Sequence, residues 1–206
     1  YNNGSITIAD SYWDKNTTGC TSSIGGGQGL TTAEMKLIST YANWNFNDKW
    51  KMVNKGSYPY FIWESTQRLT LHSADETRGT VEMSGDYPVG RPVTITAITL
   101  PGNSFLGWDG DTGYLGGNES SATVTFIMPD SPVNLTAGFS SLFTGGDGSE
   151  DNPWLISTPE QLDRVRLYLG EGHGDKHFKI VNDIDLTSYV ASGGAAGIRH
   201  HLGAGF

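Results

Sequence analysis

The chain has 206 residues, and 13 Lys and Arg stand against 22 Asp and Glu, which gives a net charge of −9. It contains no basic stretch, so we expect neither a nucleic acid nor an anionic membrane as partner. The chain has no run of about eighteen apolar residues, so we predict no membrane span. The 28 glycines are about twice the usual share, which favours short strands joined by turns over long helices.

The N-terminal region begins with short strands. Ile6 and Ile8 follow an Asn-Asn-Gly turn and indicate the first of them. A Gly-rich loop then leads to a short helix that begins at Thr31. Glu34 stands at the capping-box distance from Thr31, which predicts a helix over residues 31–36.

Several motifs of this region follow one another in a specific order. They are Tyr12-Trp13-Asp14, the Gly-rich loop at 25–29, Gly29-Leu30-Thr31-Thr32-Ala33-Glu34-Met35, Trp44-Asn45-Phe46 and Gly56-Ser57-Tyr58-Pro59-Tyr60. In this order they resemble the segment that closes a block of GLUG-type repeats in bacterial and archaeal surface proteins. The resemblance implies the last coils of a β-solenoid, in which one coil buries its apolar face only against another.

The middle region alternates apolar and polar residues over several runs separated by Gly and Pro. This period of two predicts half-buried antiparallel strands. The inward residues would be Leu69, Leu71, Val93, Ile95, Ala97, Val124, Phe126, Val133, Leu135 and Ala137. The stretches Gly107-Trp108-Asp109-Gly110-Asp111, Phe126-Ile127-Met128-Pro129 and Leu135-Thr136-Ala137-Gly138-Phe139 resemble the divergent internalin-type B repeat. We expect Trp108 to lie in its core.

The C-terminal region starts with a second helix. Thr158 fits the N-cap, Pro159 the first helical position and Gln161 the capping box, and Gly170 fits the end of the helix. Its apolar face would consist of Leu162, Val165 and Leu169. Residues 178–186 then predict a strand, a turn and another strand. These features resemble the segment that opens a GLUG-type or right-handed β-helix region.

These patterns predict a mainly β fold, with partial β-solenoid ends, a small antiparallel B-repeat-like module and two short helices. The expected domains are residues 1–64, 67–139 and 143–206. The glycine-rich C-terminus followed by the N-terminus would read as one more coil, so the chain is either a unit of a repeating array or a fragment of a longer chain.

The pattern favours a non-enzymatic structural subunit of an extracellular surface layer, sheath or filament that associates end to end. Its partners would be copies of itself or neighbouring repeats of the same polypeptide. The self-association residues would be Tyr1, Ile6, Ile8, Phe178, Ile180, Ile184 and Phe206.

Two other functions stay open. Exposed aromatic side chains would suit an adhesin or carbohydrate-binding surface protein, although they also suit a solenoid cap. The aromatic candidates are Trp44, Trp50, Tyr58, Tyr60, Phe61 and Trp63. A polysaccharide-degrading enzyme of β-helix type would use Asp183 and Asp185, which should share one strand face. No nucleophile, zinc or phosphate-loop motif supports an enzyme.

Metal candidates are few. Asp109 and Asp111, and likewise Asp147 and Asp151, have the close spacing that a Ca²⁺ site uses, but neither stretch has the EF-hand pattern, and both fit Asp-Gly turns. We favour the turns and expect no cofactor. The histidines at 173, 177, 200 and 201 lack a helix that would present them to Zn²⁺.

Modification sites follow from short motifs. The single cysteine, Cys20, has no partner for an internal disulfide and no basic neighbour that would activate it. Glycosylation sequons begin at Asn3, Asn16, Asn118 and Asn134.

Overall fold

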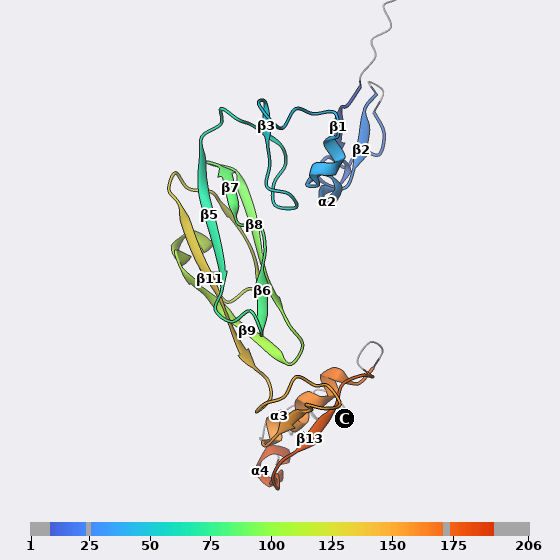
Figure 1. Cartoon of the computed structure of the whole chain (residues 1–206), viewed down its shortest axis with the longest axis vertical. Coiled ribbons are helices and arrows are strands. Elements are labelled where there is room, and N and C mark those ends of the chain that lie inside the picture. The colour runs from blue at the N-terminus through green and yellow to red at the C-terminus, as the bar shows by residue number, and fades with distance from the viewer. Residues whose placement is uncertain (1–8, 24–25, 171–173, 192–206) are drawn as a thin grey trace, which may run out of the picture. The chain divides into compact units, whose positions relative to one another are not determined.

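The computed structural model describes residues 9–23, 26–170 and 174–191. These residues form five small sheets and a few short helices, so the fold is mainly β, as predicted (Figure 1). The chain divides into two compact units. The first comprises the described residues of Tyr1–Ala74 with Val81–Ala97 and Gly107–Ala137, and the second comprises Asp75–Thr80, Ile98–Leu106 and the described residues of Gly138–Phe206.

The N-terminal segment opens with a parallel strand pair. Strand β1 (Tyr12–Asp14) and strand β2 (Gln28–Leu30) pair in parallel, and the short helix α1 (Lys15–Thr18) follows β1 directly. Helix α2 (Thr32–Met35) begins with the predicted capping box, because the Thr31 hydroxyl accepts the Glu34 N–H and the Glu34 carboxylate accepts the Thr31 N–H at 2.7 Å. The helix prediction is therefore confirmed at its start.

The rest of this segment consists of turns, one 3₁₀ helix and one short antiparallel strand pair. A 3₁₀ helix over Ile38–Tyr41 precedes strand β3 (Trp50–Lys51), which pairs antiparallel with strand β4 (Tyr60–Phe61). The register sets Trp50 opposite Phe61. Since directly opposite residues of a pair lie on the same face, these two rings are brought together.

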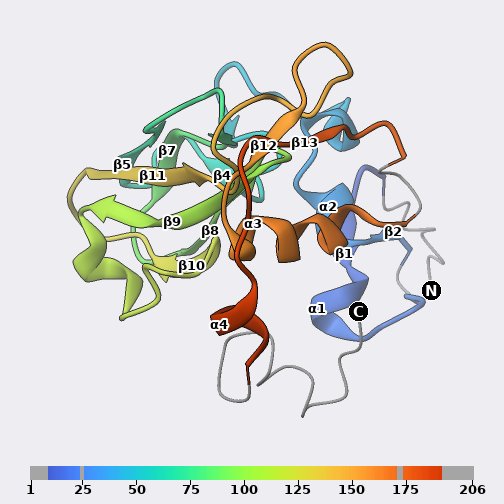
Figure 2. The ribbon, with the colours of Figure 1, turned by 90° about the horizontal axis from the view of Figure 1, so that it is seen from below.

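The middle module consists of two sheets. The four-stranded sheet has the order β7 (Gly85–Pro88), β5 (Thr66–Ser73), β11 (Val133–Ser141), β9 (Asn103–Gly110). The three-stranded sheet has the order β10 (Thr123–Ile127), β8 (Pro92–Thr99), β6 (Gly79–Val81). Figure 2 shows β5 and β11 on one side of β8 and β10. A 3₁₀ helix over Thr112–Leu115 follows β9.

The core of the module is the set of inward residues that the alternation predicts. All ten are buried, and five of them, Leu69, Ile95, Val133, Leu135 and Ala137, have 0% exposed surface. Trp108 is buried as well, and its indole N–H donates to the Ser121 carbonyl at 3.0 Å. The prediction of which residues face the core is thus confirmed.

The prediction that all strands of the module pair antiparallel was wrong for one pair. Strands β5 and β11 run parallel, with Val133 opposite Leu69 and Leu135 opposite Leu71. Alternation tells which face of a strand is buried but not its direction. The two strands are joined by a long connection rather than a hairpin, so nothing local forces them to be antiparallel.

The C-terminal segment contains a second parallel pair, formed by β12 (Trp154–Ile156) and β13 (Phe178–Ile180). Helix α3 (Pro159–Arg164) starts as predicted, with the Thr158 hydroxyl accepting the Gln161 N–H at 3.3 Å, and continues as a 3₁₀ helix over Val165–Tyr168. Three buried residues, Phe143, Trp154 and Ile156, form its core, and Leu162, Val165 and Phe178 are among the residues packed against it.

The second strand expected within residues 178–186 does not form. The Asp185 carboxylate accepts the Thr187 N–H at 2.9 Å and leads into helix α4 (Thr187–Val190), while Ile184 packs on the core cluster. A local side-chain bond to the backbone therefore replaces strand pairing here. Each terminal segment holds one parallel pair, and the described residues include no stack of solenoid coils.

Candidate interaction sites

Five aromatic rings of the N-terminal segment form a continuous column, in which two contacts are tilted and two are stacked. Tyr41 is buried and its ring lies 4.8 Å from Trp44, which in turn lies 4.3 Å from Trp50. Trp50 stacks on Phe61 at 4.1 Å, and Phe61 stacks on Trp63 at 4.2 Å with an interplanar angle of 11°. Trp63 ends the column with 70% of its surface exposed.

Hydrogen bonds fix the buried end of this column. The Tyr41 hydroxyl donates to the Met35 carbonyl at 2.7 Å, and the Trp44 indole N–H donates to the Asp10 carbonyl at 2.9 Å. Burial, together with the nearby Tyr58, Tyr12 and Asp14, raises the pKa of Tyr41 to about 12. The anchored end is therefore uncharged at physiological pH.

The aromatic candidates that the sequence suggests do not form one cluster. Trp44, Trp50, Phe61 and Trp63 belong to the column, whereas Tyr60 is buried elsewhere and donates to the Asp86 carbonyl at 2.7 Å. Sequence reasoning missed Tyr41, whose only signal is its position three residues before Trp44. The aromatic residues over 44–63 are thus mixed in role: some form the column and others hold the fold.

The Tyr58 side chain bonds to the buried carboxylate of Asp14. Its hydroxyl donates to Asp14, which caps α1 by accepting the N–H groups of Asn16 at 2.7 Å and Thr17 at 3.2 Å. Burial by itself would raise the pKa of Asp14, but the hydrogen bonds from Tyr58 and the backbone outweigh it and lower this pKa to about 2. Asp14 is therefore ionised in the folded protein and acts as a structural cap.

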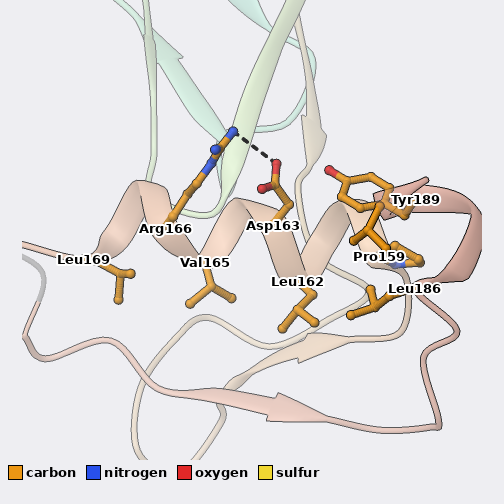
Figure 3. Close-up of a pocket in the computed structure, with 9 residues that line it drawn as sticks. Pro159, Leu162, Asp163, Val165, Arg166, Leu169, Leu186 and Tyr189 are labelled. Atoms are coloured by element: carbon orange, nitrogen blue, oxygen red, sulfur yellow. Dashed lines mark ion pairs between the residues drawn. The ribbon is translucent and has the colours of Figure 1, made fainter. Parts of the chain in front are cut away.

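An apolar groove of about 340 Å³ lies along α3 and α4. Figure 3 shows Leu162, Val165 and Leu169 on one side of the helical stretch, while Asp163 and Arg166 point to the other side. The guanidinium of Arg166 pairs with the Asp163 carboxylate at 3.2 Å. The face predicted from the sequence is thus apolar along its length. The groove is completed by Pro159, Leu186, Tyr189 and Val190.

The residues proposed for self-association have different positions. Tyr1, Ile6, Ile8 and Phe206 lie outside the described residues. Phe178 and Ile184 pack against the C-terminal core, whereas Ile180, on β13, is 57% exposed. Of the described candidates, Ile180 is the one that presents most of its surface to a partner.

The aspartates proposed as Ca²⁺ ligands mostly bond to nearby backbone. Asp109 accepts the Gly110 N–H at 2.8 Å, and Asp111 accepts the Asn134 N–H at 2.8 Å. Asp147 accepts the Ser149 N–H at 3.0 Å, and hydrogen bonds from Ser149 lower its pKa. Within the part of the chain that the structure describes, no three His, Cys, Asp or Glu side chains gather as they would around a metal ion.

The remaining acidic and histidine candidates are not assembled into a site. Asp183 and Asp185 do not share a strand face, because no strand forms there, and hydrogen bonds from Thr187 lower the pKa of Asp185. His177 is exposed and its backbone bridges Gly148 and Trp154. The histidines at 173, 200 and 201 lie outside the described residues.

Those modification candidates that lie within the described residues are on the surface. Asn16, Asn118 and Asn134 are exposed, although the Asn16 amide oxygen accepts the Thr32 N–H at 3.1 Å. Asn3 lies outside the described residues. Cys20 is an exposed free thiol.

The alternating strands and buried Trp108 of the middle module are accompanied by a match to a known family. Residues 69–142 match the family model of the divergent InlB B-repeat domain. The resemblance to such a B repeat is thereby confirmed. InlB B-repeat domains occur in cell-surface proteins, so this B-repeat domain indicates a surface protein. The resemblance of the two terminal segments to GLUG-type repeats stays a prediction.

One relative extends the comparison. A stretch of 55 residues is 56% identical to part of a protein of Evansella cellulosilytica named Gly-rich membrane protein. It covers 27% of this chain and 6% of that relative. No solved structure matches the chain. Among the described residues, no helix has the length and apolar character needed to cross a membrane.

Proposed function

We propose that this chain is a non-enzymatic structural component of an extracellular surface layer, sheath or filament. It joins copies of itself, or neighbouring repeats of a longer polypeptide, by adding strands to its terminal parallel pairs. The B-repeat domain supports the surface location. The edge of β13 with which no described strand pairs is the observation that carries the mode of association.

The hydrogen bonds around β13 tell which of its residues face outward. The His177 carbonyl accepts the Trp154 N–H at 3.0 Å, and the Val181 N–H donates to the Ile156 carbonyl at 3.0 Å. Alternate residues of a strand direct their backbone groups to opposite sides. Phe178 and Ile180 therefore point their N–H and C=O groups away from β12. Among the described residues no strand pairs with that side.

An unpaired strand edge is a template for another strand. The exposed Ile180 makes this edge apolar as well, and Val181 next to it is 43% exposed. A strand from a neighbouring coil would pair with the outward N–H and C=O groups of Phe178 and Ile180 and place a side chain beside Ile180. Burial of apolar surface would then stabilise the contact at about 25 cal/mol per Å².

The net charge sets the conditions for association. Two copies that each carry a charge of −9 repel one another at low ionic strength. Salt at about 0.15 M reduces the range of this repulsion to about 8 Å. We therefore expect association to increase with salt and with protein concentration.

Replacement of Ile180 by proline tests the proposal. Proline lacks the N–H that faces the free edge but leaves the bonds of Lys179 and Val181 to β12 in place. Ile180→Thr is the matched control, because it keeps both the N–H and a β-branched side chain. Light scattering and electron microscopy of the full chain in 0.15 M salt (about physiological) would measure the size of the particles.

We expect the unmodified chain and Ile180→Thr to form oligomers or filaments and Ile180→Pro to stay monomeric. Circular dichroism of both variants checks that the fold is retained. Equal assembly by the proline and threonine variants, or an unmodified chain that remains monomeric in salt, would refute strand addition at β13.

A further inference from the structure

We infer that the outer face of Trp63 binds a pyranose ring of a neutral polysaccharide. Trp63 ends the aromatic column in a turn directly after β4, where one of its faces lies against Phe61 at 4.2 Å. With 70% of the side chain exposed, the opposite face is open to solvent.

The geometry of the column assigns this role to Trp63 rather than to the other rings. Trp50 has neighbours at 4.3 Å and 4.1 Å, namely Trp44 and Phe61. Phe61 in turn lies between Trp50 and Trp63. Phe61 therefore has a stacked neighbour on each side, and Trp50 has one stacked neighbour, Phe61, and one tilted neighbour, Trp44. A sugar stacks on a free aromatic face, and within the column only the terminal ring offers one.

The column also holds the binding face in a fixed orientation. The Phe61 and Trp63 rings differ by only 11° in plane, and the stack behind them leads to the buried Tyr41. Hydrogen bonding of Trp44 to Asp10 fixes the column further. A side chain that is already ordered loses little conformational entropy on binding, which favours affinity for a ligand that covers a single ring.

Polar groups next to Trp63 favour a sugar over an apolar protein surface. Glu64 accepts the Phe61 N–H through one carboxylate oxygen at 2.8 Å and pairs with Arg91 through the other. The Arg91 side chain, which pairs with this sequence neighbour of Trp63, is 48% exposed and presents donors to solvent. An apolar ring on Trp63, with polar side chains on the adjacent residue and its partner, suits a ligand that has an apolar face and hydroxyl groups, as a hexopyranose does.

The charge of the chain selects among polysaccharides. A net charge of −9 repels acidic chains such as sulfated or uronic polymers. The ligand class is therefore a neutral glucan, mannan or galactan. This inference does not depend on strand addition at β13.

Affinity electrophoresis of the full chain tests the inference. Native gels would contain hydroxyethyl cellulose, laminarin, galactomannan or, as the anionic arm, dextran sulfate. The variants are Trp63→Ala, Trp63→Tyr and the control Ile62→Ala, in which the neighbouring side chain, 39% exposed, is removed without loss of a ring.

We expect at least one neutral gel to retard the chain, and Trp63→Ala to bind about tenfold more weakly or worse, as for a central aromatic anchor. Trp63→Tyr should keep part of the affinity and Ile62→Ala nearly all of it. Migration unaffected by every neutral polymer, binding to dextran sulfate alone, or equal retardation of Trp63→Ala and Ile62→Ala would each overturn the inference.

Discussion

A close contact within the second unit depends on a glycine in the turn after β8. Gly102 has a φ of +79°, and a Cβ added there would lie 2.6 Å from the ring of Trp154, which is 2% exposed. The Gly102 N–H also donates to the Tyr168 hydroxyl at 2.9 Å. Gly102→Ala therefore combines an unfavourable backbone conformation with a steric clash.

Gly90 provides a matched control. Its φ of +77° is nearly the same, but no heavy atom lies within 4 Å of the position of its Cβ. Alanine in the left-handed region costs about 1–2 kcal/mol at either position. Overpacking against Trp154 adds about 1–3 kcal/mol at Gly102 alone. We expect Gly102→Ala to lower the free energy of unfolding by about 2–5 kcal/mol and Gly90→Ala by about 1–2 kcal/mol.

Urea unfolding followed by tryptophan fluorescence and circular dichroism would measure both values. With a slope of about 1–3 kcal/mol per molar urea, the added loss at Gly102 shifts the midpoint by a measurable amount. If the chain unfolds in two steps, each variant is compared with the unmodified chain at the step that it affects. Equal losses for Gly102→Ala and Gly90→Ala would contradict a close contact with Trp154.

Three further predictions concern the core, the cap and the column. Leu135→Ala in the centre of the B-repeat domain should lower the free energy of unfolding in urea by about 2–5 kcal/mol, whereas Ile127→Ala on the surface should lower it by under about 1 kcal/mol. Similar losses for the two variants would mean that Leu135 is not buried. The ionised Asp14 stabilises the fold fully above pH about 3.8, and this contribution is lost as the pH falls toward about 2. Tyr58→Phe should raise the pKa of Asp14, as measured by carboxyl NMR, and an unchanged pKa would contradict the hydrogen bond from Tyr58. Neutral Tyr41 stabilises the fold below pH 10, and this contribution is lost as the pH rises to about 12. Tyr41→Phe should remove the tyrosine ionisation near pH 12 from the absorbance titration, and an unchanged titration would be inconsistent with the burial of Tyr41.

Much of the local structure follows from short-range chemistry. Thr31 with Glu34, and Thr158 with Pro159 and Gln161, predict the starts of α2 and α3 because each side chain satisfies backbone groups within its own turn. Period-two alternation predicts the buried face of β5, β8, β10 and β11 in the B-repeat domain, because successive side chains of a strand point to opposite sides.

The candidate sites were less accessible to such reasoning. The aromatic residues over 44–63 could be grouped by composition, but neither the order of the column nor the exposure of Trp63 could be predicted. The same holds for Asp185, whose carboxylate takes the Thr187 N–H and so ends the extended stretch that the hydrophobic pattern favoured. In both cases two local arrangements were compatible with the sequence, and packing selected one.

The sequence by itself determined the ten buried residues of the B-repeat domain, the starts of α2 and α3, and that the chain is mainly β, since these depend on periodicity and on hydrogen bonds within a few residues. Only the tertiary structure decided the parallel pairing of β5 with β11, the contact of Tyr58 with Asp14 across 44 positions, and the stacking that leaves one face of Trp63 free. Contacts of this kind depend on long chain segments meeting in space. A repeating pattern encodes which side of a strand is apolar, but not which distant strand or ring will cover it.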